Sequence, residues 1–216
     1  MSKTKTVVAI NGDGIGREIV TAARRVVDAA VAKDNIKIEW IEQKAGGEAI
    51  DAYGEPLPAD TIKACEAAHA VLLGAVGGPQ WDDVAPAIRP EKAILGLRKA
   101  LGLFCNFRPV RIFKALQEYS PLKPELVQDV DFVIVRELTG GIYFGEREEA
   151  QGEGPNELAW DKETYHRYEI ERIMDVAIET AGKRRGKVTS VDKANVLASS
   201  RLWRKIAQEK AQANPE

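Results

Sequence analysis

The sequence is poor in the residues that build zinc sites and disulfide frameworks. Its 216 residues include two cysteines, two histidines and two methionines, too few for a zinc centre or a disulfide-rich secreted domain. We expect Cys65 and Cys105 to be free thiols within a helix and a strand, with a single disulfide between them as the alternative. We interpret His69 and His166 as surface or packing residues.

The sequence also lacks a surplus of positive charge and any apolar run long enough to span a bilayer. It carries 31 Lys and Arg against 33 Asp and Glu, a net charge of −2, which argues against binding to nucleic acid or to a membrane surface. The first residues lead into a strand pattern without the apolar segment of a signal peptide. These absences predict a soluble, cytoplasmic protein.

Strand-like and helix-like patterns alternate along the chain, which is typical of an α/β fold with a mostly parallel sheet covered by helices. The expected strands are 5–10, 36–41, 70–74, 131–135 and 187–191, and the expected helices are 16–32, 59–68, 91–98, 162–181 and 198–211. The pattern changes past Phe104, so we expect a first domain over 1–103 and a second over 104–216. Residues 143–160 are rich in Gly, Glu and Pro, and their composition alone predicts a mobile loop.

The expected helix 91–98 has one face of mixed character. Four residues share it at helical spacing: Glu91, Ile94, Leu95 and Arg98. A core-facing stripe would be apolar at all four positions, because burial of an unpaired charge is costly. Arg98 is therefore expected to meet an anion. With Arg108 and Arg136 it would hold a small polycarboxylate through paired N–H to oxygen bonds, whereas the plain alternative is a set of surface arginines.

Two glycine-rich turns follow expected strands. The glycines of Asn11-Gly-Asp-Gly-Ile-Gly16 lack the spacing of a dinucleotide fingerprint, and the loop lysine of a nucleotide triphosphatase is absent. We interpret this segment as a tight turn that needs positive φ. Gly74-Ala-Val-Gly-Gly-Pro79 is either a turn or a surface on which a planar ring lies.

Six sequence blocks carry a resemblance to a known family. They are Asn11–Gly16, Leu73–Pro79, Glu91–Arg98, Asn106–Pro109, Val135–Gly145 and Ser190–Leu197. On these blocks the sequence resembles the metal-dependent decarboxylating dehydrogenases, which include isopropylmalate, isocitrate, homoisocitrate and tartrate dehydrogenases. The resemblance implies an isopropylmalate dehydrogenase-like fold whose first domain lacks its C-terminal part here, and a second α/β domain. It also implies a homodimer in which a β-arm at about 143–160 pairs with the same arm of a second subunit.

The resemblance further implies roles for individual residues. Tyr143 and Lys193 would be catalytic; Arg98, Arg108, Arg136, Ile94 and Leu95 would bind substrate; Gly77, Gly78, Pro79, Glu91 and Asn195 would contact NAD. Lys193 would reach the active site of the other subunit and accept a proton, while Tyr143 would donate one. The ligands of the expected Mg²⁺ or Mn²⁺ ion would lie beyond residue 216, so no metal ligand is assigned.

The implied reaction is oxidative decarboxylation of (2R,3S)-3-isopropylmalate with NAD to 2-oxoisocaproate (4-methyl-2-oxopentanoate), a step of leucine biosynthesis. Ile94 and Leu95 favour an apolar substituent by roughly 1.5–3 kcal/mol per buried side chain, which selects 3-isopropylmalate over isocitrate. The alternatives are a homoisocitrate, tartrate/malate or isocitrate dehydrogenase. A truncated protein that keeps the arginines but only binds or dimerises is a further alternative.

Overall fold

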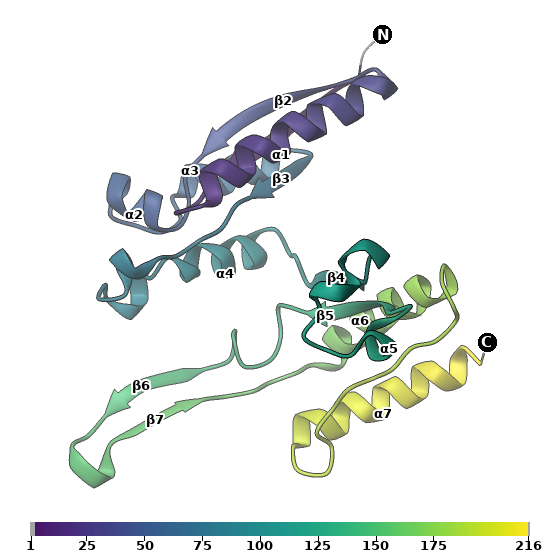
Figure 1. Cartoon of the computed structure of the whole chain (residues 1–216). Helices are drawn as coiled ribbons and strands as arrows, with labels where there is room; N and C mark the ends of the chain where they lie inside the picture. The colour runs from purple at the N-terminus through teal and green to yellow at the C-terminus, as the bar shows by residue number, and fades with distance from the viewer. Residues whose placement is uncertain (1–2, 216) are drawn as a thin grey trace. The chain divides into compact units, whose positions relative to one another are not determined.

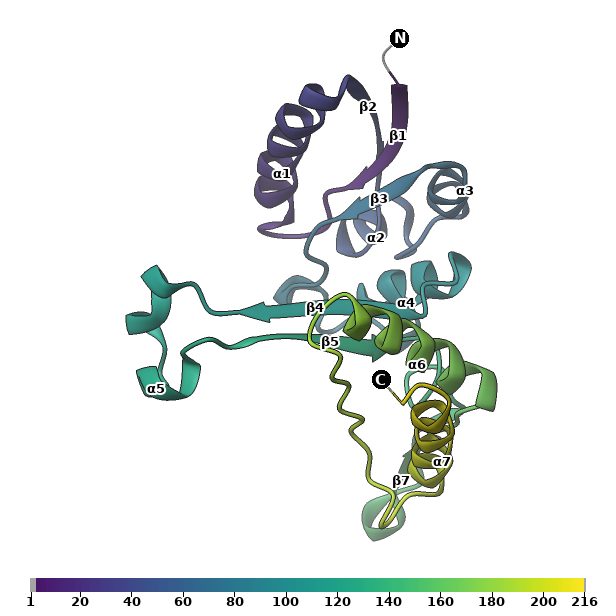
Figure 2. The same cartoon turned by 90° about the vertical axis from the view of Figure 1, so that its right-hand side faces the viewer.

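The computed structural model describes residues 3–215. The chain divides into two compact units, Met1–Gly102 and Leu103–Glu216, and Figures 1 and 2 show their elements from two sides. In the part of the chain described, no helix is long and apolar enough to cross a membrane.

The first unit is built on a parallel sheet with the strand order β2-β1-β3. Its strands are β1 (Lys3–Ile10), β2 (Ile36–Gln43) and β3 (Ala70–Leu73), and its α-helices are α1 (Gly16–Val31), α2 (Gly47–Tyr53), α3 (Ala59–Ala67) and α4 (Glu91–Ala100). The central strand β1 ends in three fully buried apolar residues, as expected for a strand covered on both faces. The hydrophobic core of the first unit comprises Val8, Ile10, Ala45, Cys65, Ala93 and Leu97.

The second unit is built around an antiparallel pair, β4 (Cys105–Arg111) and β5 (Asp131–Glu137). Its α-helices are α5 (Pro124–Val127), α6 (Arg167–Gly182) and α7 (Ala198–Ala213). Helix α6 packs against both β5 and α7, and Figure 2 shows it beside the strand pair. Ile170, Met174 and Ile206 form the core between α6 and α7. The expected parallel arrangement therefore holds for the sheet of the first unit, whereas β4 and β5 run antiparallel.

Helix α6 begins at Arg167, five residues later than predicted. His166 is its N-cap, and a reciprocal capping box joins it to Glu169. The backbone N–H of His166 donates to Glu169 Oε2 at 2.7 Å. This local pairing satisfies N–H groups that a longer helix would have bonded internally, so it fixes the helix start.

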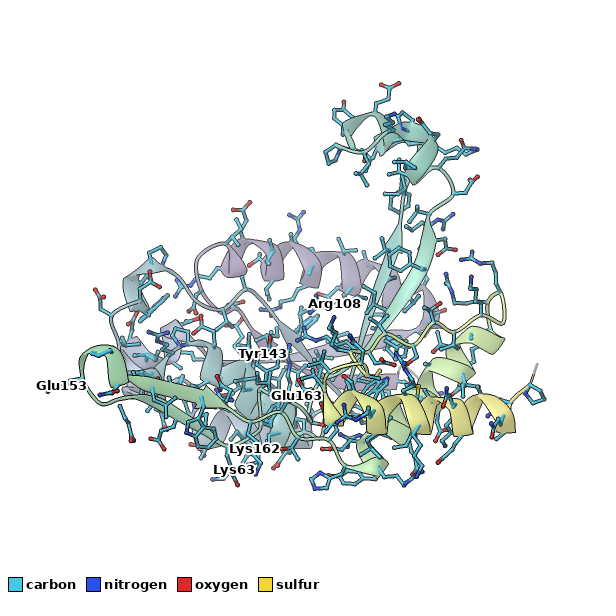
Figure 3. The ribbon with its side chains drawn as sticks, turned by 90° about the horizontal axis from the view of Figure 1, so that it is seen from below. Lys63, Arg108, Tyr143, Glu153, Lys162 and Glu163 are labelled. Atoms are coloured by element: carbon cyan, nitrogen blue, oxygen red, sulfur yellow. The ribbon has the colours of Figure 1, made fainter. Side chains whose placement is uncertain are left out.

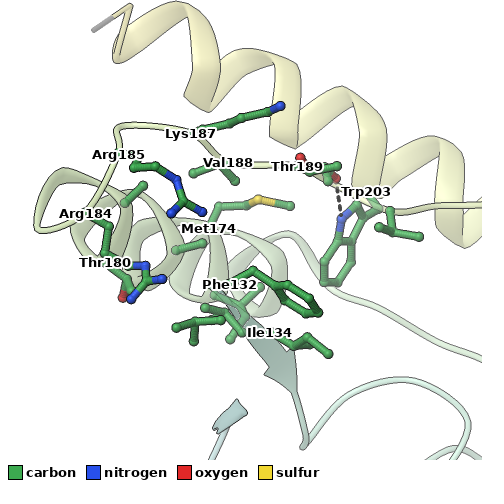
Figure 4. A pocket seen from close by; sticks show the side chains of 17 residues that line it. Phe132, Ile134, Met174, Thr180, Arg184, Arg185, Lys187, Val188, Thr189 and Trp203 are labelled. Carbon is green, nitrogen blue, oxygen red and sulfur yellow. Dashed lines mark hydrogen bonds between the residues drawn. The ribbon is translucent and has the colours of Figure 1, made fainter. Parts of the chain in front are cut away.

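The predicted strand 187–191 does not form; this expectation is wrong. The segment lines a cavity of about 580 Å³ together with residues of β5 and α6 (Figure 4). A strand needs a neighbour that exchanges backbone hydrogen bonds with it, and here the cavity lies where such a neighbour would be. Its Ser190 instead accepts a hydrogen bond from Trp203 Nε1 on α7 at 3.1 Å.

Residues 143–160 do not form the loop that their composition predicts. They contain most of an antiparallel ribbon of β6 (Arg147–Gln151) and β7 (Leu158–Asp161), whose residues are all exposed. Figure 3 labels Glu153 near the tip of the ribbon and Lys162 and Glu163 near its base.

Both cysteines are free thiols, as predicted. Burial raises the pKa of Cys65 on α3. The pKa of Cys105 on β4 is raised first by burial and then by the negative charge of Glu137, the residue opposite it on β5.

Candidate functional site

Helix α4 presents the predicted mixed face on a side that differs from its core side. Ala93 and Leu97 are buried and anchor the helix. Ile94, Leu95 and Arg98 are half-buried, and Glu91 is exposed. Glu91 lies in the first turn and Arg98 in the last, an order that the helix dipole favours. The three partly covered residues therefore remain candidates for substrate contact.

A buried carboxylate organises both glycine turns of the first unit. Asp13 is 3% exposed, and its Oδ2 accepts the N–H groups of Gly47 at 2.9 Å and Gly77 at 2.7 Å. Its Oδ1 accepts the N–H of Glu48 at 2.8 Å. Asp13 thereby ties the turn after β1 to the start of α2 and to the turn after β3.

The turn after β1 has the predicted backbone geometry. Gly12 has φ 69° and Gly14 has φ 52°, which confirms the tight-turn interpretation of this segment. A Cβ at Gly12 would lie 2.0 Å from the carbonyl oxygen of Ala75. The two glycine turns therefore approach each other as closely as backbone atoms allow.

Gly77, Gly78 and Glu91 lie together. Gly77 has φ 99°, and a Cβ there would lie 3.0 Å from Glu91 Oε1. Gly78 and Glu91 both line a cavity of about 280 Å³, together with Trp81, Asp82, Arg89 and Pro90. Pro79 is exposed and opens the short 3₁₀ turn Pro79–Trp81. The first unit thus gathers four of the five residues predicted to contact a cofactor.

In the second unit, Arg108 and Arg136 share one face of the β4–β5 pair. Arg108 lies opposite Ile134 and Asn106 lies opposite Arg136, so the two arginines are diagonal neighbours. Arg108 Nε donates to Asn106 Oδ1 at 2.6 Å. Its guanidinium is exposed, and Arg136 is half-buried.

Tyr143 is another predicted site residue that lies next to Arg136, as Arg108 does. The Arg136 Cζ lies 5.6 Å from the centroid of the Tyr143 ring, within cation–π distance. Arg147 Nη2 donates to the Tyr143 carbonyl oxygen at 2.6 Å. Tyr143 itself is exposed. Two cations and a phenol are therefore available on one side of the second unit.

Lys193 and Asn195 are exposed residues of the turn before α7. The turn is held by Asp192, which accepts the Ala194 N–H at 2.9 Å and pairs with Arg204 at 2.7 Å. The Arg204 guanidinium lowers the pKa of Asp192. Lys193 follows an irregular segment and not the strand 187–191 that the sequence predicted. Within residues 3–215 no hydrogen bond, ion pair or ring contact joins Lys193 to Tyr143.

Sequence reasoning missed a buried cluster beneath Tyr143. The Glu137 side chain is 2% exposed and pairs with Arg172 of α6 at 2.7 Å. Its carboxylate also accepts the N–H groups of Thr139 and Gly140. The available signal was an acidic residue between an apolar strand pattern and a glycine turn, since such a residue needs internal partners when it is buried.

The residues described show no site for a metal ion. Among residues 3–215, no group of three or more His, Cys, Asp or Glu side chains is close enough to hold one.

A sequence model of the family described as isocitrate/isopropylmalate dehydrogenase matches residues 6–216. The chain belongs to this family. It is 49% identical over 218 residues to the 3-isopropylmalate dehydrogenase of Sodalis glossinidius, covering 100% of this chain and 60% of that one. It is 52% identical over 211 residues to the enzyme of that name from Clostridium pasteurianum, covering 97% and 59%.

The fold is also that of solved family members. The crystal structure of isocitrate dehydrogenase from Methylococcus capsulatus superposes with a TM-score of 0.81 at 31% identity, covering 98% of this chain and 58% of that one. The family fold assigned from the sequence is confirmed. The chain spans about 60% of the length of the relatives it matches, so the activity and substrate are taken up below as proposals.

Proposed function

We propose that this chain carries the substrate-contacting and cofactor-contacting residues of an NAD-dependent 3-isopropylmalate dehydrogenase that acts as a homodimer. The observation that carries the proposal is the shared face of Arg108 and Arg136 with Tyr143 beside it. Two guanidinium groups bind carboxylates through paired hydrogen bonds, and a phenol next to them is placed to donate a proton.

Substrate choice falls to the first unit. Arg98 supplies a further cation for a malate carboxylate, and the half-buried Ile94 and Leu95 supply apolar surface on the same face of α4. A branched aliphatic substituent is stabilised by such a surface, whereas the third carboxylate of isocitrate loses its hydration there without gaining a partner. These residues therefore favour 3-isopropylmalate within the family.

The cofactor is assigned to the glycine turn after β3. Gly78 and Glu91 line the same cavity, Gly77 lies beside the Glu91 carboxylate, and this carboxylate offers an acceptor to hydroxyl groups of the cofactor. NAD would supply the hydride acceptor for oxidation of the substrate carbinol. Asn195 would contact the cofactor amide from the turn before α7.

Proton transfer is assigned to Lys193 and Tyr143. Lys193 Nζ accepts the proton of the substrate hydroxyl, and the Tyr143 hydroxyl delivers a proton to the carbon that loses carbon dioxide. The described residues do not form a metal site, so the expected Mg²⁺ or Mn²⁺ is given no step here.

Dimerisation is assigned to the β6–β7 ribbon. An isolated two-stranded ribbon is marginally stable in water and offers unpaired edges. This ribbon also exposes Leu158 to 62% and Trp160 to 42%. Pairing with the same ribbon of a second copy covers both features, and a partner subunit could then supply the exposed Lys193.

Titration of the 216-residue chain with 3-isopropylmalate and with isocitrate tests the substrate assignment. We expect binding of 3-isopropylmalate that weakens roughly tenfold or more in Arg108→Ala and in Arg136→Ala. The matched control is Arg111→Ala, because Arg111 lies on the opposite face of β4 and should leave the affinity unchanged. Equal affinity for both acids, or an equal loss in the control, would contradict the proposal.

A second candidate function is a dicarboxylate-binding, dimerising protein without catalysis. It rests on two features of the described residues, the shared face of Arg108 and Arg136 and the exposed β6–β7 ribbon. An assay for NADH formation from 3-isopropylmalate with Mg²⁺ tests the second candidate in one direction. Turnover by this chain excludes it, whereas binding without turnover is expected of both candidates, because the ligands of the expected metal ion would lie beyond residue 216.

A further inference from the structure

The Glu137 carboxylate binds the Thr139–Gly141 turn, which leads into Tyr143. Its Oε2 accepts the N–H of Thr139 at 3.0 Å and that of Gly140 at 2.7 Å. Its Oε1 accepts the Thr139 hydroxyl at 3.1 Å. Arg136 precedes Glu137 on β5, and side chains alternate along a strand, so the two point to opposite faces. Arg136 therefore lies on the candidate substrate face of β5, and Glu137 binds the turn from the opposite face.

Arg172 of α6 holds Glu137 in place. Its Nη2 donates to Glu137 Oε1 at 2.7 Å and also to the Thr139 hydroxyl. The guanidinium contacts two rings, with its Cζ 4.6 Å from the centroid of Phe104 and 5.4 Å from that of Tyr168. Two aromatic faces restrict its rotation, so the carboxylate meets a cation of fixed orientation.

The other side of the turn is closed by Tyr165. A Cβ at Gly141 would lie 2.5 Å from the Tyr165 hydroxyl oxygen, and one at Gly140 would lie 2.9 Å from its ring. The Gly141 N–H donates to the Thr164 carbonyl at 2.9 Å. The Glu137 carboxylate and the Tyr165 ring therefore together restrict the backbone conformation of the Thr139–Gly141 turn.

We propose that Glu137 and Arg172 are positioning residues, which fix the Thr139–Gly141 turn and thereby hold Tyr143 next to Arg136. The inference rests on the proposed function, in which Arg136 binds a carboxylate and Tyr143 donates a proton. Neither Glu137 nor Arg172 needs to touch the substrate. Their effect is to keep the Arg136 guanidinium and the Tyr143 ring at one mutual distance.

The test compares Glu137→Gln, Arg172→Met and Arg172→Lys by two measurements on the 216-residue chain. The first is the set of nuclear Overhauser effects between the Arg136 side chain and the Tyr143 ring, and the second is the affinity for 3-isopropylmalate. The matched control is Glu179→Gln, which breaks an exposed ion pair with Lys183 on the same helix.

We expect Glu137→Gln and Arg172→Met to lose the Arg136–Tyr143 effects and to bind 3-isopropylmalate roughly tenfold more weakly. Arg172→Lys keeps the charge and should stay within about threefold of the wild type. A purely stabilising pair would instead lower the melting temperature and leave both measurements unchanged in the folded protein; that outcome overturns the proposal.

The two proposals fail separately. If the wild-type chain does not bind 3-isopropylmalate, the proposed function fails, and the Arg136–Tyr143 effects still decide the positioning role. Their persistence in folded Glu137→Gln overturns that role whatever the ligand does. Should Glu137→Gln not fold, Thr139→Val removes only the hydroxyl that links the pair. We then expect it to weaken the same effects, and unchanged effects count against the proposal.

Discussion

Asp13 in the first unit and Glu137 in the second are both nearly inaccessible carboxylates that accept backbone N–H groups from glycine turns. Asp13 accepts from Gly47, Glu48 and Gly77, which lie 34 to 64 residues away in the sequence. Glu137 accepts from the adjacent turn and, in addition, from a guanidinium on α6.

This difference separates two uses of a buried acid. The bonds to Asp13 join three segments that are distant in sequence, so they help to define the fold of the first unit. The backbone bonds to Glu137 are local, and one cation ties them to a neighbouring helix. Loss of Asp13 should therefore unfold structure, whereas loss of Glu137 should mainly redirect a turn.

The largest effect is expected for Asp13→Ala. Three backbone N–H groups lose a charged acceptor, and we expect the first unit to be destabilised by about 4 kcal/mol. Hydrogen exchange of peptides from each unit, measured against urea concentration, checks this and reports the units separately. Asp13→Asn keeps the shape and one acceptor oxygen and should cost less. Equal protection in Asp13→Ala and wild type would remove the distinction drawn above.

A smaller effect is expected for Gly12→Ala. Comparing its loss of stability with that of Gly14→Ala measures how much the close approach of the two turns contributes. Both residues have positive φ, but only Gly12 faces the Ala75 carbonyl. We expect Gly12→Ala to cost about 3 kcal/mol, from both strain and overlap, and Gly14→Ala about 1 kcal/mol, from strain alone. Urea unfolding of the two variants checks this. Equal losses would mean that the turns can separate at little cost.

The sequence predicted the elements whose signals are local. The strand pattern of β1, the helical spacing in α4 and the positive φ of Gly12 and Gly14 each depend on residues within a few positions, and the structure confirms them. The role of Asp13 could not be predicted, because its partners are distant in sequence. The failed strand 187–191 has the same cause, since a β-branched run does not specify its neighbour.

The candidate site was predictable only as a set of residues. Helical periodicity placed Ile94, Leu95 and Arg98 on one face of α4, and the structure agrees with that placement. Periodicity does not show which buried residues on the other face of a strand hold a site residue in position. Glu137 and Arg172 were therefore missed, although they surround the turn that carries Tyr143. The catalytic role of Tyr143 itself stays a prediction.

A moderate effect is expected when Glu137 loses its cation. In Arg172→Met the carboxylate stays buried without its charged partner, which would cost several kcal/mol in a dry interior. The Arg172 side chain is 30% exposed, so water can reach the gap, and we expect a loss of about 2 kcal/mol. Thermal unfolding of Arg172→Met beside Glu179→Gln checks this. A loss as large as that of Asp13→Ala would place Glu137 in the fold-defining class.

The smallest effect is expected at the two thiols, one in each unit, and it tests the charge of Glu137 directly. Burial raises the pKa of both thiols, and the Glu137 carboxylate opposite Cys105 raises the pKa of that thiol further. Glu137→Gln removes a negative charge that disfavours the thiolate, so the pKa of Cys105 should fall toward its ordinary value. Alkylation of Cys105 by iodoacetamide at pH 8 should then become about two- to threefold faster, because the thiolate is the nucleophile.

Cys65 lies in the other unit and is the internal control for that experiment; its alkylation rate should not change. A loosened turn could also speed the reaction at Cys105 by exposing it, and the pH profile separates the two causes. Removal of the charge moves the midpoint of the rate to lower pH and leaves the high-pH plateau unchanged, whereas exposure raises the plateau. An unmoved midpoint would show that the Glu137 charge does not affect the pKa of Cys105. Arg172 would then neutralise that charge by itself.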